Sequence, residues 1–211
     1  MAFRLFLKPK LTIGSVTGDT VEIKVGKSTM FRVHESVLLQ SPFFANALKP
    51  EWVAARKGKP IDLKEEDPDS FAGYVQWLYS HNIDTTYNTT KWAGLYVLGE
   101  ELMDATFQDQ VLETMAQGCE AKVSYPTGKA INIIYDGTPE GSPARRLLID
   151  FHVWGAGETW VKGIDIASNR PKDFINDLLL ALVGRRGRLN SKKTWVMDIS
   201  MYHVKTSTKD K

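Results

Sequence analysis

The sequence predicts an α+β fold, in which a small mixed β-sheet is capped by a cluster of α-helices. Two stretches near the start, TVEIKV and TMFRV, alternate apolar and polar residues, which is the period of a half-buried strand. A third short stretch, KPIDL, lies among segments whose apolar residues recur at helical spacing. Strands placed among helices are typical of a small sheet covered by helices.

The tripeptide GKS, at residues 26–28, separates the first two predicted strands. A phosphate-binding loop has the pattern G-x-x-x-x-G-K-[ST], in which the earlier glycine lets backbone amides surround a phosphate. Val21 occupies the position of that glycine, which argues against a nucleotide site. Gly26 instead suits the positive φ of a tight turn. We therefore predict a β-hairpin from residues 20–25 and 29–33.

Two short helices are predicted after the hairpin. Residues 34–40, HESVLLQ, place Val37 and Leu38 on one side of the first helix. In the next stretch, SPFFANAL, Ser41 is a good N-cap and Pro42 fits the first helical position. The apolar residues of this stretch recur at i, i+3 and i+4, as expected for a helix that packs on one face.

A charged loop and a third strand are predicted next. The loop is WVAARKGK, at residues 52–59, and the strand surrounds Ile61 and Leu63. Asp67 then caps a long helix that Pro68 begins. Two more helices follow, near residues 90–102 and 104–121. The residues that we expect to face inward are Phe71, Tyr74, Val75, Leu78 and Tyr79 in the first helix, Trp92, Leu95 and Leu98 in the second, and Phe107, Val111, Met115 and Cys119 in the third.

Composition indicates an ordinary globular chain of 211 residues, 43% hydrophobic and 25% charged. Its single cysteine, Cys119, excludes an intramolecular disulfide and suits a reducing compartment. The N-terminal apolar stretch is short and broken by Arg4 and Lys8, unlike a secretory signal. The longest apolar run elsewhere, residues 178–183, is far below the roughly 20 residues of a membrane span. We expect a cytoplasmic and/or nuclear protein without a membrane partner.

The charge is divided unevenly along the chain. Residues 1–123 carry 13 Lys and Arg against 16 Asp and Glu, a net −3, whereas residues 124–211 carry 14 against 9, a net +5. The excess is concentrated in GRRGRLNSKK, at residues 184–193. Such a run complements a helix dipole or forms a solvated loop. Nuclear import and a weak nucleic-acid contact are the alternatives, but no nucleic-acid motif is present, and we expect no such partner.

Residues 31–48, FRVHESVLLQSPFFANAL, contain F-x-V-H-x-x-x-L followed by S-P-F-F. Residues 59–83, KPIDLKEEDPDSFAGYVQWLYSHNI, contain I-x-L followed by D-P-x-x-F-x-x-x-V-x-W-L-Y. Together, these two elements resemble the BTB/POZ domain, especially its fungal branch. Later, ARRLLIDFHVWGAGETWV and PKDFINDLLLALVGR are similar to the C-terminal part of such fungal proteins.

The chain is predicted to have four parts, of which the resemblance covers the middle two. Residues 1–15 are an N-terminal segment that a dimer would exchange, and residues 16–123 are the BTB/POZ-like domain. Residues 124–187 form a helical C-terminal extension. Residues 188–211 are a basic tail, in which the alternating stretch TWVMDISMY predicts a strand. If the N-terminal segment is not exchanged in a dimer, its stretch FRLFL pairs instead with TWVMDISMY of its own chain.

The resemblance also implies a protein–protein interaction module and not an enzyme, with a homodimer as the usual state. In many relatives, residues corresponding to Asp19 and His34 lie near each other in a charged groove at the dimer interface. Glu35 stands where relatives often have Lys or Arg, which alters the charge of that groove. The interface candidates are Phe3, Leu5, Leu7, Asp19, His34, Glu35, Val37, Leu38 and Phe43.

Two functions of different classes are compatible with such an interaction module. In the first, preferred here, the chain is a self-associating scaffold or regulator whose C-terminal helices supply a specific surface for another protein. In the second, it is a substrate adaptor for a cullin-type ubiquitin ligase. Trp52 and Val53 are the partner-loop candidates for that role, but Ala54 stands where cullin-binding relatives usually have an acidic residue.

An enzymatic function is the remote alternative. A lone histidine such as His34, between a strand and an apolar helix, is typically a capping or hydrogen-bonded framework residue, and partner recognition is its alternative role. Cys119 lies on an apolar helical stripe, where a buried inert thiol is the usual finding. A cysteine nucleophile needs an adjacent base, for which the sequence has no signature. One cysteine and four dispersed histidines give no metal-ligand spacing, so we expect neither metal nor cofactor.

Overall fold

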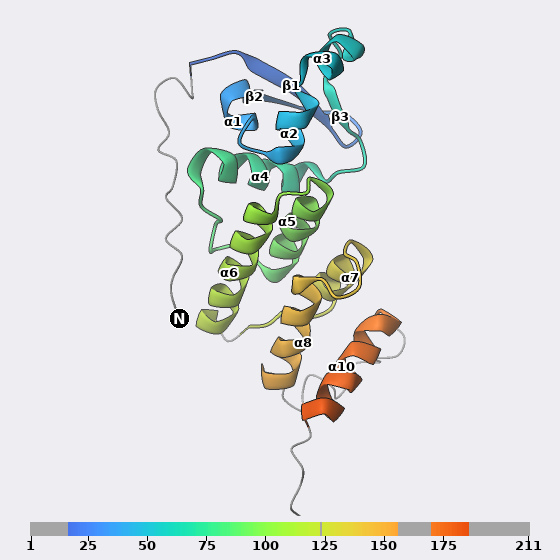
Figure 1. The fold of residues 1–211 in the computed structure, drawn as a ribbon. Helices are drawn as coiled ribbons and strands as arrows, with labels where there is room; N and C mark the ends of the chain where they lie inside the picture. Colours follow the sequence, from blue (N-terminus) through green and yellow to red (C-terminus); the bar gives the residue numbers. More distant parts are fainter. Residues whose placement is uncertain (1–16, 123, 156–169, 186–211) are drawn as a thin grey trace, which may run out of the picture.

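The structure, a computed structural model, describes residues 17–122, 124–155 and 170–185. It is an α+β fold, as predicted, in which a three-stranded mixed sheet lies at one end and helices extend from it (Figure 1). Within the described residues, no helix combines the length and the apolar character that a membrane span requires. The segments 1–15 and 188–211 lie outside the described residues, and so does the predicted pairing of FRLFL with TWVMDISMY.

The sheet has the strand order β2-β1-β3. β1 (Thr20–Val25) pairs antiparallel with β2 (Thr29–His34) and parallel with β3 (Ile61–Leu63). The predicted hairpin and third strand are therefore confirmed. Gly26 begins the hairpin turn with a φ of 60°, a conformation that favours glycine because it lacks a Cβ.

Three short helices follow the hairpin and precede β3. They are α1 (Glu35–Leu38), α2 (Pro42–Ala47) and α3 (Pro50–Arg56). Ser41 occupies the N-cap position of α2 as predicted, but its side chain makes no capping hydrogen bond. It is completely buried instead, which shows that an N-cap position does not by itself imply a cap bond.

The prediction of a charged loop at residues 52–59 was wrong, because α3 occupies most of it. Its helical signals are a proline at the first position, an acidic first turn, two consecutive alanines and a basic last turn. The helix is followed directly by Lys57 and Gly58, whose φ angles of 51° and 76° turn the chain toward β3. The dense positive charge of the segment concealed these signals.

Three longer helices form the centre of the molecule: α4 (Pro68–Ser80), α5 (Thr89–Glu101) and α6 (Ala105–Lys122). Asp67 caps α4 as predicted, since its carboxylate accepts the Ser70 backbone N–H at 2.8 Å. The predicted inward faces are confirmed except that Val75 and Tyr79 are only half-buried.

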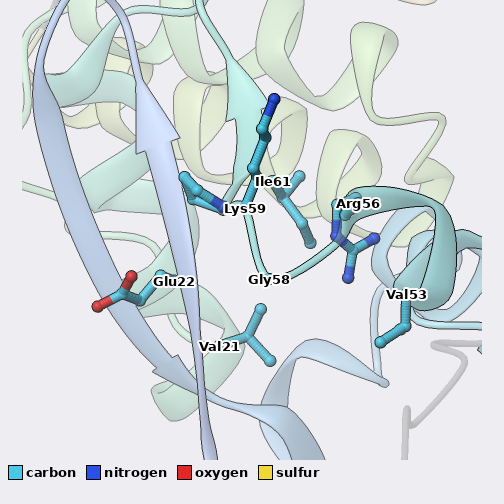
Figure 2. Close-up of a pocket in the computed structure, with 8 residues that line it drawn as sticks. Val21, Glu22, Val53, Arg56, Gly58, Lys59 and Ile61 are labelled. Carbon is cyan, nitrogen blue, oxygen red and sulfur yellow. The ribbon is translucent and has the colours of Figure 1, made fainter.

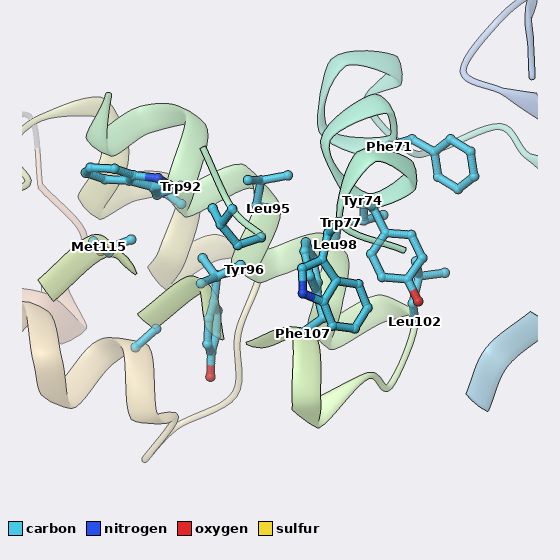
Figure 3. Packing of buried hydrophobic residues seen from close by; sticks show 14 of the residues in the cluster. Phe71, Tyr74, Trp77, Trp92, Leu95, Tyr96, Leu98, Leu102, Phe107 and Met115 are labelled. Carbon is cyan, nitrogen blue, oxygen red and sulfur yellow. The ribbon is translucent and has the colours of Figure 1, made fainter. Parts of the chain in front are cut away.

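Aromatic rings fill the centre of the core (Figure 3). The Phe107 ring meets Tyr74 edge-on at a centroid distance of 4.7 Å and lies tilted against Trp77 at 4.9 Å. The Tyr74 hydroxyl donates to a buried Asp104 oxygen at 2.7 Å, and the other oxygen accepts the Phe107 backbone N–H at 3.1 Å. Burial, together with the charge of Asp104, raises the pKa of Tyr74, so this hydroxyl remains a donor.

The C-terminal part adds α7 (Lys129–Asp136), α8 (Pro143–Gly155) and α10 (Lys172–Arg185). α7 packs against α5, and its buried residues Ile131 and Ile134 belong to the same continuous core as the sheet residues. The C-terminal helices are thus a continuation of the packed core. The strands and α10 lie at opposite ends of the molecule (Figure 1).

A buried arginine joins the end of α7 to α8. The Arg145 guanidinium donates to the Thr138 hydroxyl at 3.1 Å and to the Tyr135 carbonyl at 2.7 Å, and it also bonds the Thr138 carbonyl. Its central carbon lies 4.5 Å from the centroid of the Tyr135 ring. These partners offset the desolvation of a charge that is only 8% exposed.

Candidate functional site

The charged-groove candidates lie where the hairpin meets the first helix. Asp19 and Glu35 are exposed, and the Asp19 carbonyl accepts the Glu35 backbone N–H at 2.9 Å. Thr20 pairs with His34 across the hairpin. The backbone therefore brings Asp19 next to the His34–Glu35 pair, as the resemblance implies.

His34 is a hydrogen-bonded framework residue. Its Nδ1 lies 2.6 Å from the Tyr79 hydroxyl, and its backbone N–H donates to the same oxygen at 3.2 Å. It occupies the N-cap position of α1, but its side chain makes no capping hydrogen bond. The half-buried ring is thus tied to α4, so it joins the hairpin to the helical core.

The apolar interface candidates are corrected in part. Val37 and Leu38 have no exposed surface, because α1 turns both into the core of its own chain. They therefore cannot contact a partner in this conformation. Phe43 is half-buried and meets the Phe44 ring edge-on at 5.1 Å. The remaining candidates, Phe3, Leu5 and Leu7, lie outside the described residues.

The partner-loop candidates lie on α3, which buries none of its residues. Trp52 is 54% exposed and Val53 is 45% exposed. Trp52 lines a pocket of about 380 Å³ formed with the end of α2. Val53 lines a second pocket, of about 180 Å³, between α3 and the sheet (Figure 2). Arg56 lines both pockets, and its guanidinium donates to the Ala47 carbonyl at 2.5 Å.

Positive charge surrounds these two apolar side chains. Residues 49–59 contain four cationic side chains and one acidic side chain, Glu51, which gives a net charge of +3. The cations are Lys49, Arg56, Lys57 and Lys59. The ion pairs found among the described residues are Arg32–Glu22 at 2.8 Å and Lys64–Glu65 at 3.3 Å. None of the four cations is therefore neutralised by a carboxylate of the described parts of the chain.

A second group of exposed apolar side chains lies on α10. It comprises Leu179, Leu180, Leu182 and Val183. The other side of α10 packs through buried Phe174 against α8 and α7. Leu180 also borders a pocket of about 400 Å³ between α10 and α8, whose charged lining includes Arg146, Asp150 and Asp177. The run LLLALV was a signal for this face, because it is apolar all round and one packed side cannot bury it.

Cys119 and His152 lie outside these pockets. Cys119 is completely buried, and burial raises the pKa of its thiol to about 11, although Lys122 partly offsets the shift. The thiol is therefore protonated at neutral pH and a poor nucleophile. His152 is partly buried on α8, and its Nδ1 lies 2.8 Å from the Leu148 carbonyl. Among the described residues, no group of three or more His, Cys, Asp or Glu is arranged to hold a metal ion.

Comparisons with family models, with curated proteins and with solved structures find no significant match to this chain.

Proposed function

We propose that this chain is a protein–protein interaction module of the BTB/POZ type, which self-associates and holds a partner protein. The observation that carries the proposal is the placement of its exposed large apolar side chains. Two groups of them, on α3 and on α10, lie at opposite ends of the molecule (Figure 1). Contiguous exposed apolar surface is typical of protein interaction sites.

The order of elements supports the BTB/POZ assignment. A hairpin, short helices, a third strand parallel to β1 and a helical cluster follow each other in the described residues. The apolar motif residues Val33, Phe44, Phe71 and Trp77 are all buried. Because these motif residues build the core, the motif specifies the fold. The proposed binding surfaces are formed by other residues.

We assign self-association to the α10 face. With Val37 and Leu38 buried, the described N-terminal candidates offer a second copy mainly charged residues and Phe43. The α10 face instead presents four large aliphatic side chains without an intervening charge. Interfaces between identical subunits are more apolar than other interfaces, and twofold dimers are the commonest oligomers. The α10 face therefore suits burial against a second copy.

Light scattering at micromolar concentration tests this proposal. The intact chain should have twice the monomer mass of 23.7 kDa. The double substitution Leu179→Lys and Val183→Lys, one turn apart on α10, should give the monomer mass. Leu39→Lys is the matched control, because Leu39 is an exposed apolar residue that is distant from α10 in the sequence. This variant should leave the dimer intact. A monomeric mass for the intact chain would contradict self-association.

A cullin-ligase adaptor is the second candidate, and the exposure of Trp52 and Val53 favours it. Both side chains are presented on a helix, where the resemblance places the cullin-contacting residues. The absence of the usual acidic residue, at Ala54, weighs against it. Titration of the intact chain with a purified cullin scaffold, followed by calorimetry, distinguishes the two candidates. Binding that Trp52→Ala abolishes would favour the adaptor.

A further inference from the structure

We infer that α3 and its flanks bind an acidic segment of a partner protein that carries apolar anchor side chains. The surface, called here the α3 surface, comprises Lys49, Trp52, Val53, Arg56, Lys57 and Lys59. The inference rests on the proposed function as an interaction module and adds the chemistry of the partner.

The apolar part of the α3 surface is arranged to receive two anchors. Trp52 and Val53 precede Arg56 by four and three residues, so all three side chains lie on neighbouring parts of one helix face. One pocket adjoins Trp52 and the other adjoins Val53, with Arg56 at the border of both. Tryptophan and arginine are the residues most enriched among those that dominate binding energy. Two neighbouring pockets suit a segment with two apolar side chains a short distance apart.

The charged part of the α3 surface selects carboxylates. Its net charge is +3 over residues 49–59, and none of its cations is paired with a carboxylate of the described residues. Glu22, which lines the smaller pocket, is itself paired with Arg32, so it does not offset Arg56 and Lys59. The bond to the Ala47 carbonyl orients the Arg56 guanidinium before any partner arrives. A pre-oriented guanidinium loses less conformational freedom on binding a carboxylate.

Other anionic macromolecules fit this surface less well. Proteins that bind nucleic acid strongly through phosphates make about 6–10 such contacts, more than four cations can provide. A membrane surface would leave two separate pockets without a role. A second copy of this chain remains a competitor, because Glu65, Glu66 and Glu101 lie close enough to interact and form an acidic cluster. The experiment distinguishes this competitor.

The test is selection of a displayed library of random 16-residue peptides against the intact chain. The selected peptides should be rich in Asp and Glu and carry at least two large apolar residues. Fluorescence polarisation of a labelled selected peptide should show at least tenfold weaker binding by Trp52→Ala, and the same loss for Lys57→Glu with Lys59→Glu. Affinity should also fall as salt is raised, because the contacts are electrostatic in part.

Matched controls separate this surface from general stickiness. Trp154→Ala removes another exposed tryptophan, and Lys129→Glu reverses another exposed lysine; both should leave peptide affinity unchanged. Since Trp52, Lys57 and Lys59 are all exposed, the variants at these positions should keep the wild-type melting temperature.

Three results would overturn the inference. The first is that no peptide is enriched, or that the enriched peptides lack acidic residues. The second is that Trp52→Ala binds as tightly as the wild type. The third is that the lysine reversals dissociate the dimer, which would make a second copy the occupant. A dimer that persists without any peptide binding would refute this inference alone, whereas a monomer would refute the proposed self-association.

Discussion

The helices α3 and α4 begin and end alike but differ in what they contact. Each has a proline in its first turn, and each ends at a non-glycine residue with a φ of 51°, Lys57 for α3 and His81 for α4. The α4 cap Asp67 makes a side-chain hydrogen bond, and α4 buries six residues. Lys49 makes no such bond, and α3 buries none. Local signals therefore define both helices, but burial decides which one builds the fold.

The difference has an energetic consequence. Isolated helices shorter than about 12–15 residues are marginal in water, and α3 has seven. α4 gains its stability from the core, whereas α3 depends on its ends: Pro50 at the start and the Arg56 bond to the Ala47 carbonyl near the finish. A helix supported in this way leaves its apolar side chains available for another protein.

The sharpest test of this difference is a pair of aromatic truncations. Phe44→Ala removes a ring with no exposed surface and should lower the free energy of unfolding by roughly 3–5 kcal/mol. Trp52→Ala removes a larger but exposed ring and should lower it by less than about 0.5 kcal/mol. Urea denaturation measures both. Similar losses for the two variants would remove the distinction between the core helix elements and the exposed helix α3.

A pair of glycine substitutions compares a packed helix position with an exposed one. A Cβ at Gly118 of α6 would collide with the buried Trp92 ring, so Gly118→Ala should cost about 1–3 kcal/mol of unfolding free energy. A Cβ at Gly184 of α10 meets nothing within 4 Å. Gly184→Ala should be neutral or stabilising, because alanine is the better helix former. Thermal denaturation of both variants provides the comparison, and a stabilised Gly118→Ala would contradict the tight packing.

Substitution of the two N-cap residues should also affect stability differently in α3 and α4, but by a smaller amount. Asp67→Ala should cost about 1 kcal/mol, and Lys49→Ala should cost almost nothing. Burial acts to raise the pKa of Asp67, but hydrogen bonds from Ser70 and the charge of Lys91 more than offset it, so the pKa is lowered. The ionised cap therefore stabilises the fold above the ordinary pKa of 3.8, and this contribution is lost as pH falls through the lowered value.

Chemical denaturation of wild type and Asp67→Ala at a series of pH values measures that dependence. The difference in stability between the two should shrink as the pH falls below 3.8. A difference that stays constant down to the lowest pH would mean that the ionised carboxylate is not the stabilising group.

The smallest effect concerns His152, which packs α8 against Phe174 of α10 with ring centroids 5.0 Å apart. Burial, and to a lesser degree Arg170, lowers the pKa of His152, whereas the Leu148 carbonyl opposes the shift. As pH falls below the ordinary value of 6.5, the unfolded chain takes up this proton first, so stability decreases until the lowered pKa is reached. Melting temperatures of His152→Gln should fall less between about pH 7.5 and 5.5 than those of the wild type. An identical fall in both would exclude His152 as the source.

The framework was predictable because its signals are strong and local. Alternating strands around Gly26, the Asp67 cap with Pro68, and the apolar stripes of α4, α5 and α6 all lie as predicted. The α3 helix was missed because its charges suggested a loop, although its proline, alanines and basic last turn were visible. α7 lies within residues 124–187, which were predicted to be a helical extension, but its bounds were not predicted.

The proposed binding surfaces were harder to predict than the fold. In a helix as short as α1, spacing does not tell whether Val37 and Leu38 face their own core or a partner. Trp52 and Val53, the partner-loop candidates, are exposed, but their pockets depend on how α3 is placed against α2 and the sheet. The α10 face was indicated only by an unusually broad apolar run.

The position of α3 also bears on how such a protein can change over time. The helix lies within the long connection between the antiparallel pair and β3, and its last residue, Arg56, bonds the Ala47 carbonyl. Substitutions along its outer side leave the strand register and the aromatic centre untouched. The recognition proposed for α3 can therefore diverge between descendants of one ancestral gene while the scaffold that displays it is inherited unaltered.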